Sequence, residues 1–290
     1  MSSLILGCGY TGTRLAKRDL AGGTPVQAVV SKPERVHELA AQNIEAVAWN
    51  LDQRAPAPSL APFDTLVYLA PPPSSGDTDP RLEHALDALG SQPKRLIYIS
   101  TTGVYGNRNG TRVTEDDAPS PESARAHRRV AAERTATAWA RSHGARCVIL
   151  RVPGIYGPSR LPLKAIMDAR PVLAQAEAGP GNRIHVDDLV TVIQRVREAS
   201  DPPDILNVGD GNPLSSTDFT FEVARQTGRP PPPEHSLDAL RAEVSEMAWS
   251  FIRESRLVDV SRLHNTLAPP LRYLDPKAGI AASLQEMDAG

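Results

Sequence analysis

Three glycines near the start of the chain have the spacing of a phosphate-binding loop. Gly7, Gly9 and Gly12 form the pattern Gly-x-Gly-x-x-Gly between an apolar run at 4–6 and a helix-like stretch at 13–20. In such a loop the first glycine permits a tight turn, the second lets a pyrophosphate approach, and the third lets helix pack on strand. The pattern predicts a dinucleotide-binding site, against the alternative of a plain glycine turn. The loop residues that we expect at the ligand are Gly7, Gly9, Tyr10, Thr11 and Gly12.

The residues after the second apolar run bear on which dinucleotide binds. An acidic residue about 20 positions after the glycine loop would hold the adenosine 2′-hydroxyl and favour NAD. Ser31 stands there instead, followed by Lys32 and Arg35, and either cation could pair with a 2′-phosphate. We therefore expect NADP(H). NAD(H), or no cofactor with the two cations at a solvated helix start, are the alternatives.

Apolar runs alternate with helix-like stretches over the first half of the chain. The runs are apolar throughout, as in parallel strands that are covered on both faces. The expected strands span 4–6, 26–30, 45–49, 63–70, 95–100 and 146–152, and the expected helices 13–20, 33–41, 80–89 and 125–142. This alternation predicts an α/β fold with a Rossmann-type doubly wound parallel sheet.

After Pro153 the pattern becomes less regular. Helices are expected over 187–199, over 216–226 with Ser216 as the N-cap, and over 237–252, with a strand over 204–208. We expect a smaller C-terminal substrate-binding lobe at the carboxyl edge of the sheet, where ligands of open α/β sheets bind. The predicted domains are a dinucleotide-binding domain over 1–160, to which 185–209 return, and a lobe made of 161–184 and 210–290.

Composition narrows the class of protein. The 290 residues are 40% hydrophobic and 23% charged with a net charge of -2, which is ordinary for a soluble globular protein. The charge gives no reason to expect nucleic acid or an anionic membrane as a partner, and no apolar run approaches the roughly 20 residues of a membrane span. No signal peptide and no metal site are expected. Cys8 and Cys147 are expected to be thiols in the reducing cytoplasm.

Several segments carry a resemblance to a known family. Residues 98–106 read YISTTGVYG, 151–158 read RVPGIYGP, 183–189 read RIHVDDL and 206–210 read LNVGD. In this order they resemble the Ser/Thr-rich loop, the nicotinamide loop, the His-Val-Asp-Asp element and the Asn-Val strand of extended short-chain dehydrogenases/reductases of the NAD-dependent epimerase/dehydratase family. The resemblance implies hydride transfer with a nicotinamide cofactor.

On the cofactor side the resemblance assigns roles to matching positions. Asp52 resembles the family aspartate that bonds to the adenine amine. Ala70 and Pro71 would line the ribose side, and Pro153 belongs to the nicotinamide loop.

The chain departs from the family at its Tyr-x-x-x-Lys pair. Counting back from Ala132-Glu133, which follow the lysine in the family, places Arg129 at the lysine position and Arg125 at the tyrosine position. A guanidinium stays protonated and has no acceptor, so Arg125 cannot act as an acid or base near neutral pH. Arg129 could still bond to a ribose hydroxyl or a phosphate. The resemblance is therefore to atypical members that lack the pair.

The remaining candidates for the chemistry are hydroxyls and imidazoles. Thr101 matches the family's catalytic hydroxyl and Thr102 lies beside it, with satisfaction of the strand-end backbone as the alternative role. Tyr156 in the nicotinamide loop is a candidate stand-in acid. His127 and His185 are further candidates because histidine is the residue type that ordinarily changes charge near neutral pH, although such residues are more often structural or exposed.

The substrate side leaves two functions open. Arginines in segments expected near the cleft suggest an anionic ligand, against a reading as scattered surface residues; they are Arg108, Arg112, Arg125, Arg128, Arg129, Arg160 and Arg183. Gly181 stands where nucleotide-sugar enzymes often place an arginine, which argues against a nucleotide sugar. We expect an oxidoreductase or epimerase-like enzyme with a small-molecule substrate; the alternative is a non-catalytic NADP(H)-binding redox sensor. The resemblance also implies a homodimer through the helices after the fourth and fifth strands.

Overall fold

The computed structural model describes residues 1–90 and 92–289. The chain folds into two compact units. The first contains Met1–Val104, Pro121–Arg151 and Val190–Leu206; the second contains Tyr105–Ser120, Val152–Leu189 and the described residues from Asn207 onward. The domain boundaries expected from the sequence remain a prediction.

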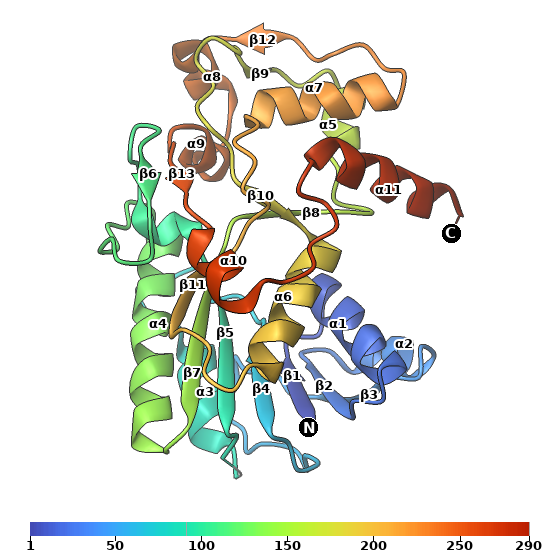
Figure 1. The fold of residues 1–290 in the computed structure, drawn as a ribbon, viewed down its shortest axis with the longest axis vertical. Coiled ribbons are helices and arrows are strands. Elements are labelled where there is room, and N and C mark those ends of the chain that lie inside the picture. Colours follow the sequence, from blue (N-terminus) through green and yellow to red (C-terminus); the bar gives the residue numbers. More distant parts are fainter. Residues whose placement is uncertain (91, 290) are drawn as a thin grey trace. The chain divides into compact units, whose positions relative to one another are not determined.

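A seven-stranded sheet forms the centre of the first unit (Figure 1). Its order is β11-β7-β5-β4-β1-β2-β3, and the pairings from β3 through β5 are parallel. The strands are β1 (Ser3–Leu6), β2 (Val26–Val30), β3 (Glu45–Ala48), β4 (Thr65–Tyr68), β5 (Arg95–Thr101), β7 (Arg146–Val152) and β11 (Ile205–Asn207). The strand order reverses between β1 and β4, the point where doubly wound sheets bind ligands. The predicted fold class is confirmed.

The helices of this unit begin at clear local signals. They are α1 (Tyr10–Ala21), α2 (Pro33–Ala40), α3 (Pro80–Ala88), α4 (Ala124–Ser142) and most of α6 (Val186–Glu198). Asp79 caps α3 by accepting a hydrogen bond from the Leu82 amide at 3.2 Å, and Ser123 caps α4 by accepting from the Ala126 amide at 3.2 Å. Proline opens both α2 and α3, where its missing N–H costs nothing.

Two buried ion pairs fix these helices. Arg151 of β7 donates from Nη2 to Glu133 of α4 at 2.9 Å, and the same carboxylate accepts from the Ser100 hydroxyl at 2.5 Å. Arg197 of α6 pairs with Asp19 of α1, and the two side chains are 4% and 0% exposed. The helix that follows the glycine loop is therefore held by a residue 178 positions later in the chain.

Short parallel strand pairs and helices build the second unit. The pairs are β8 (Gly154–Tyr156) with β10 (Arg183–His185), β9 (Val172–Leu173) with β12 (Glu234–His235), and β6 (Arg112–Val113) with β13 (Leu257–Val258). The helices are α5 (Leu163–Met167), α7 (Ser216–Gln226), α8 (Leu237–Glu243), α9 (Glu246–Ile252), α10 (Ser261–Leu267) and α11 (Pro276–Ala289). A 3₁₀ turn, η1 (Thr102–Tyr105), lies where the chain leaves the first unit.

Two predictions for this unit were wrong. The N-cap of α7 is Ser215 and not Ser216, because the Ser215 hydroxyl accepts a hydrogen bond from the Asp218 amide at 3.0 Å. Residues 237–252 form two helices and not one. Val244 is extended, and the Ser245 hydroxyl accepts from the Ala248 amide at 3.2 Å to start α9. In both places a serine side chain offers the backbone a cap that periodicity does not reveal.

No helix within the described residues is long and apolar enough to cross a membrane.

Candidate functional site

The three glycines of the loop have different neighbours. Gly7 has a φ of +88°, and a Cβ there would lie 2.5 Å from the Ala70 amide nitrogen. A Cβ at Gly12 would lie 3.2 Å from both Ile5 and Leu69, which is tight packing of α1 on the sheet. A Cβ at Gly9 would meet no protein atom within 4 Å. The first glycine is therefore needed for the turn, the third for packing, and the second borders open space.

The start of α1 is open to an anion. Gly9 is the N-cap, it supplies no side-chain hydrogen bond, and the first turn has no acidic residue. The unpaired N–H groups and the dipole of a helix start both favour negative charge. Together with the open space at Gly9, this is the arrangement that phosphate binding requires.

A cleft of about 200 Å³ lies at the carboxyl ends of β1, β2 and β4. It brings together five residues predicted from the sequence: Gly7, Ser31, Asp52, Ala70 and Pro71. It is also lined by Val29, Val30, Trp49, Asn50, Leu51 and Arg81, which sequence reasoning did not assign to the site. All of these residues belong to the first unit.

The two cations expected at a 2′-phosphate lie beside this cleft. Lys32 is exposed and is the N-cap of α2, directly after the cleft residue Ser31. Arg35 forms an exposed ion pair with Glu38. Burial raises the pKa of the Cys8 thiol to about 11, opposed by a hydrogen bond with Thr13 and by the charge of Arg35. Cys8 is thus a neutral thiol and no nucleophile. Arg35 is near enough to the glycine loop for its charge to affect the Cys8 thiol.

Arg81 closes one side of the cleft through Asp52. Its Nε and Nη2 donate to the two carboxylate oxygens of Asp52 at 2.6 and 2.8 Å, and Nη1 donates to the Pro71 carbonyl at 3.0 Å. The hydrogen bond from Arg81 holds the pKa of Asp52 below its usual range. Asp52 therefore stays an anion, and its remaining lone pairs can accept from an amine. The Asp-Pro pair at 79–80 predicts a helix start, but no local sequence pattern predicts the direction of the Arg81 side chain.

The Thr101 hydroxyl at the end of β5 has the backbone role expected of it, and its catalytic role stays a prediction. The Thr101 hydroxyl accepts a hydrogen bond from the Gly103 amide at 3.1 Å, which satisfies the turn after the strand. A hydroxyl that accepts one bond still has its proton to donate. Thr101 is half-buried, whereas Thr102 is buried at the start of η1.

Arg129 is fixed against β5. Its Nη1 donates to the Tyr98 hydroxyl and to the Ile99 carbonyl, each at 2.9 Å. Burial raises the pKa of Tyr98 to about 12, so this phenol stays neutral. The guanidinium has five N–H donors, so Arg129 retains donors for a ligand. Arg125 lies half-buried in the first turn of α4, and neither arginine lines the cleft.

Tyr156 and His185 belong to the core of the second unit. Tyr156 is 4% exposed, contacts Phe219 and His185 edge-on, and packs so closely on α11 that a Cβ at Gly279 would lie 2.1 Å from its hydroxyl. Burial raises the pKa of the Tyr156 phenol well above its ordinary value. His185 is 1% exposed, with Nε2 3.2 Å from the Ser283 hydroxyl. These placements give no support to either residue as an acid, and Pro153 also belongs to the second unit.

Most of the arginines singled out from the sequence have internal partners. Arg108 donates to the Tyr105 and Ala118 carbonyls, Arg112 to Asp259, and Arg128 to the Gly76 carbonyl. Arg183 is buried and donates to the Leu214 carbonyl at 2.6 Å. Such contacts are structural, so they do not favour an anionic substrate. His127, the other imidazole considered, is exposed on α4.

No side chain fits at position 181, where an arginine would be expected for a nucleotide sugar. A Cβ at Gly181 would lie 2.3 Å from the Leu214 carbonyl oxygen, and the Arg183 guanidinium is its next neighbour.

A buried carboxyl in the second unit makes the stability of the protein depend on pH. Asp210 is 6% exposed; one oxygen accepts from the Asn212 amide at 2.9 Å, and the other has no hydrogen-bond partner among the described residues. Burial raises the pKa of Asp210 to about 7, against the opposing charge of Arg183. The folded state then binds a proton that the unfolded state has lost, so stability falls as the pH rises from about 4 to about 7.

Asp210→Asn is expected to remove this dependence. An amide keeps the acceptor for Asn212 and cannot ionise, so the variant should be more stable than the wild type by up to about 4 kcal/mol at pH 8. Near pH 4 the two proteins should match. Urea unfolding at both pH values measures the difference, and equal stability at pH 8 would contradict the assignment.

Comparisons with known proteins agree with this architecture. Residues 3–209 match the sequence model of the NAD dependent epimerase/dehydratase family. Protein YeeZ of Escherichia coli K12 is 26% identical over 286 residues, which cover 94% of this chain and 96% of that protein. A dTDP-glucose 4,6-dehydratase of Streptomyces niveus is 29% identical over 143 residues, but the match covers only 46% of this chain and 42% of the dehydratase.

A solved structure resembles the whole chain. It is that of a functionally unknown conserved protein from Silicibacter pomeroyi DSS, with a TM-score of 0.85 and 28% sequence identity. The match covers 98% of both chains, so it includes the smaller unit as well as the sheet.

Proposed function

The chain belongs to the NAD dependent epimerase/dehydratase family of oxidoreductases, and on that premise we propose that it binds NADP(H) and acts on a small molecule. The observation that carries the proposal is the glycine loop with the cleft beside it. The open space at Gly9, the uncapped start of α1 and the 200 Å³ cleft fit a pyrophosphate with an adenosine attached.

The residues around the cleft supply the hydrogen-bond donors, the acceptor and the positive charge that the cofactor requires. The amides at the start of α1 would hold the pyrophosphate, and Asp52 would accept from the adenine amine beside Arg81. Lys32 would meet a 2′-phosphate, because Ser31 leaves no carboxylate there to hold a 2′-hydroxyl. NADP(H), when bound, supplies or accepts the hydride. The cation at this position supports NADP(H) over NAD(H).

On the reaction side the proposal assigns two roles to residues of the first unit. The Thr101 hydroxyl donates a hydrogen bond to a substrate oxygen, because the hydroxyl oxygen already accepts a hydrogen bond from the Gly103 amide. Arg129, held by Tyr98, binds the ribose with its remaining donors in place of a lysine. Neither group moves a proton, so the proton comes from water.

Turnover of NADPH tests the proposal. NADPH should be consumed with at least one fraction of a metabolite pool, and Thr101→Ala should lower kcat about tenfold, the value of one lost hydrogen bond. NADPH affinity should not change in this variant. Thr137→Ala is the matched control, because the Thr137 hydroxyl donates to the Glu133 carbonyl within α4 and bonds to the Cys147 thiol, away from the cofactor cleft. Tight NADPH binding without turnover of any fraction would instead indicate a binding protein.

A further inference from the structure

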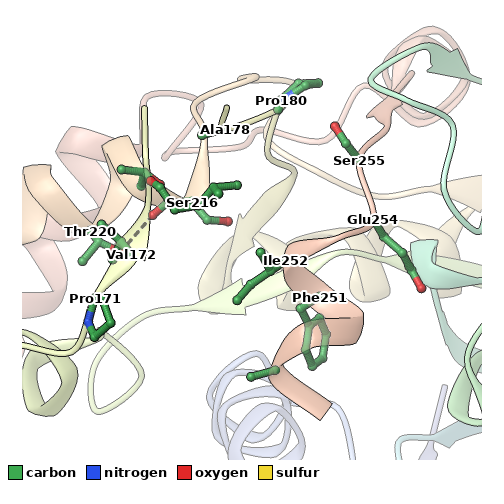
Figure 2. Close-up of a pocket in the computed structure, with 14 residues that line it drawn as sticks. Pro171, Val172, Ala178, Pro180, Ser216, Thr220, Phe251, Ile252, Glu254 and Ser255 are labelled. Atoms are coloured by element: carbon green, nitrogen blue, oxygen red, sulfur yellow. Dashed lines mark hydrogen bonds between the residues drawn. The ribbon is translucent and has the colours of Figure 1, made fainter. Parts of the chain in front are cut away.

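The second unit contains a cavity of about 370 Å³, in the range of small-molecule sites (Figure 2). Its walls come from β9, from residues 178–180, from the start of α7 and from α9 with the two residues beyond Arg253. All of these segments lie within the second unit. None of the residues that line it was assigned to a binding or catalytic site from the sequence.

The walls are mainly apolar. Val172 of β9 borders the cavity on one side, and Phe251 and Ile252 of α9 border it on another (Figure 2). Leu173 of β9 also lines it. Phe251 is 62% exposed although it is aromatic and borders a cavity. Leaving such a side chain in water costs free energy that an apolar ligand would recover.

One hydroxyl in the cavity is unsatisfied. The Thr217 hydroxyl donates to the Leu173 carbonyl at 2.6 Å, and that of Thr220 donates to the Ser216 carbonyl at 2.8 Å. The Ser255 hydroxyl oxygen is buried and has no hydrogen-bond partner among residues 1–90 and 92–289. A Cβ at Gly179 would lie 2.1 Å from this oxygen, so only glycine leaves the hydroxyl room. A buried hydroxyl without a partner costs about 1–3 kcal/mol, which a ligand oxygen would offset.

The cavity has no positive charge to receive an anion. No lysine, arginine or histidine is among its lining residues in the described part of the chain. Its one carboxylate, Glu254, accepts from Arg256 Nη2 at 2.6 Å, and its side chain extends away from Val172 and Ser216 in Figure 2. Burying a phosphate or carboxylate here would leave its charge unpaired, which is costly.

We propose that this cavity binds an uncharged, largely apolar small molecule, with one hydroxyl or carbonyl oxygen of that molecule bonded to Ser255. The inference does not depend on the proposed function, because every residue that lines the cavity belongs to the second unit. The proposed ligand is neutral, unlike the anionic ligand expected from the arginines. It also differs from a nucleoside diphosphate, whose charge the cavity does not match.

Two probes of one shape and different charge test the proposal. They are 2-naphthylmethanol, which is neutral, and 2-naphthoate, which is anionic; binding to the full chain is followed by naphthalene fluorescence and calorimetry. The alcohol should bind at least tenfold more tightly than the carboxylate. Phe251→Ala should weaken the alcohol at least fivefold, and Ser255→Ala should weaken it about threefold. Met247→Ala is the control, because Met247 is 71% exposed on the same helix and does not line the cavity.

Three results would overturn the proposal. They are naphthoate binding as tightly as the alcohol, alcohol binding that survives Phe251→Ala, and no alcohol binding up to millimolar concentration. NADPH titration of the same samples separates this failure from that of the proposed function, because the cofactor cleft is lined only by residues of the first unit.

Discussion

Gly9→Ala is expected to weaken NADP(H) binding about 10- to 100-fold without loss of stability, whereas Gly7→Ala should damage both. A methyl group on Gly9 meets no protein atom within 4 Å, so the folded chain accommodates it. It would instead occupy the space through which the pyrophosphate approaches, and each charged hydrogen bond lost costs about 1.5–3 kcal/mol.

The Gly7 variant is the counterpart of the Gly9 variant. An alanine there would adopt a φ of +88° with its Cβ 2.5 Å from the backbone of Ala70, and that strand end cannot yield as a side chain would. We expect a loss of about 2–4 kcal/mol in the free energy of unfolding. Calorimetric titration with NADPH and urea unfolding of both variants provide the measurements. A Gly9 variant that binds like the wild type would contradict the assignment of the loop.

Asp19→Asn is expected to destabilise the protein by about 3–5 kcal/mol. Asp19 is fully buried and accepts hydrogen bonds from the Arg197 guanidinium and, at 2.7 Å, from the side-chain amide of Gln194. The amide would leave the Arg197 guanidinium buried without its counter-charge, which costs more than the ion pair itself contributes. Because Asp19 belongs to α1, we also expect weaker NADP(H) binding as the helix loses its anchor on α6.

Chemical denaturation with matched variants measures this cost. Asp168→Asn removes the exposed partner of Lys164 and Arg170, and each such surface pair contributes about 1 kcal/mol at most. The double variant Asp19→Leu with Arg197→Met should recover much of the loss, since no charge remains buried. If Asp19→Asn cost no more than Asp168→Asn, the buried pair would not hold α1.

Local signals were sufficient for the sheet and the loop. The ranges 26–30 and 146–152 were predicted as the structure has them, because parallel strands buried on both faces are apolar throughout. The glycine pattern predicted Gly7 and Ser31 near one ligand, the family resemblance added Asp52, Ala70 and Pro71, and all five line one cleft. This works because the turns after neighbouring parallel strands meet at one edge of the sheet.

Tertiary packing decided what the sequence could not predict. Arg81 is held at the cleft by Asp52, some thirty residues earlier, which accepts from Nε and Nη2, and by the Pro71 carbonyl, which accepts from Nη1. Tyr156 has the sequence context of a nicotinamide loop, yet it packs against Phe219 in the core of the second unit. The apolar cavity beside Ser255 is built from segments up to about eighty residues apart, and no local pattern joins them.

The most direct test of the account is a titration of the wild type and of Lys32→Glu with NADPH and with NADH. The account predicts that the wild type binds NADPH at least about tenfold more tightly, since one cation on a phosphate contributes about 1.5–3 kcal/mol. Lys32→Glu should abolish this preference and leave NADH affinity within about threefold. Equal affinities in the wild type, or a preference that survives Lys32→Glu, would contradict the assignment of NADP(H) to this cleft.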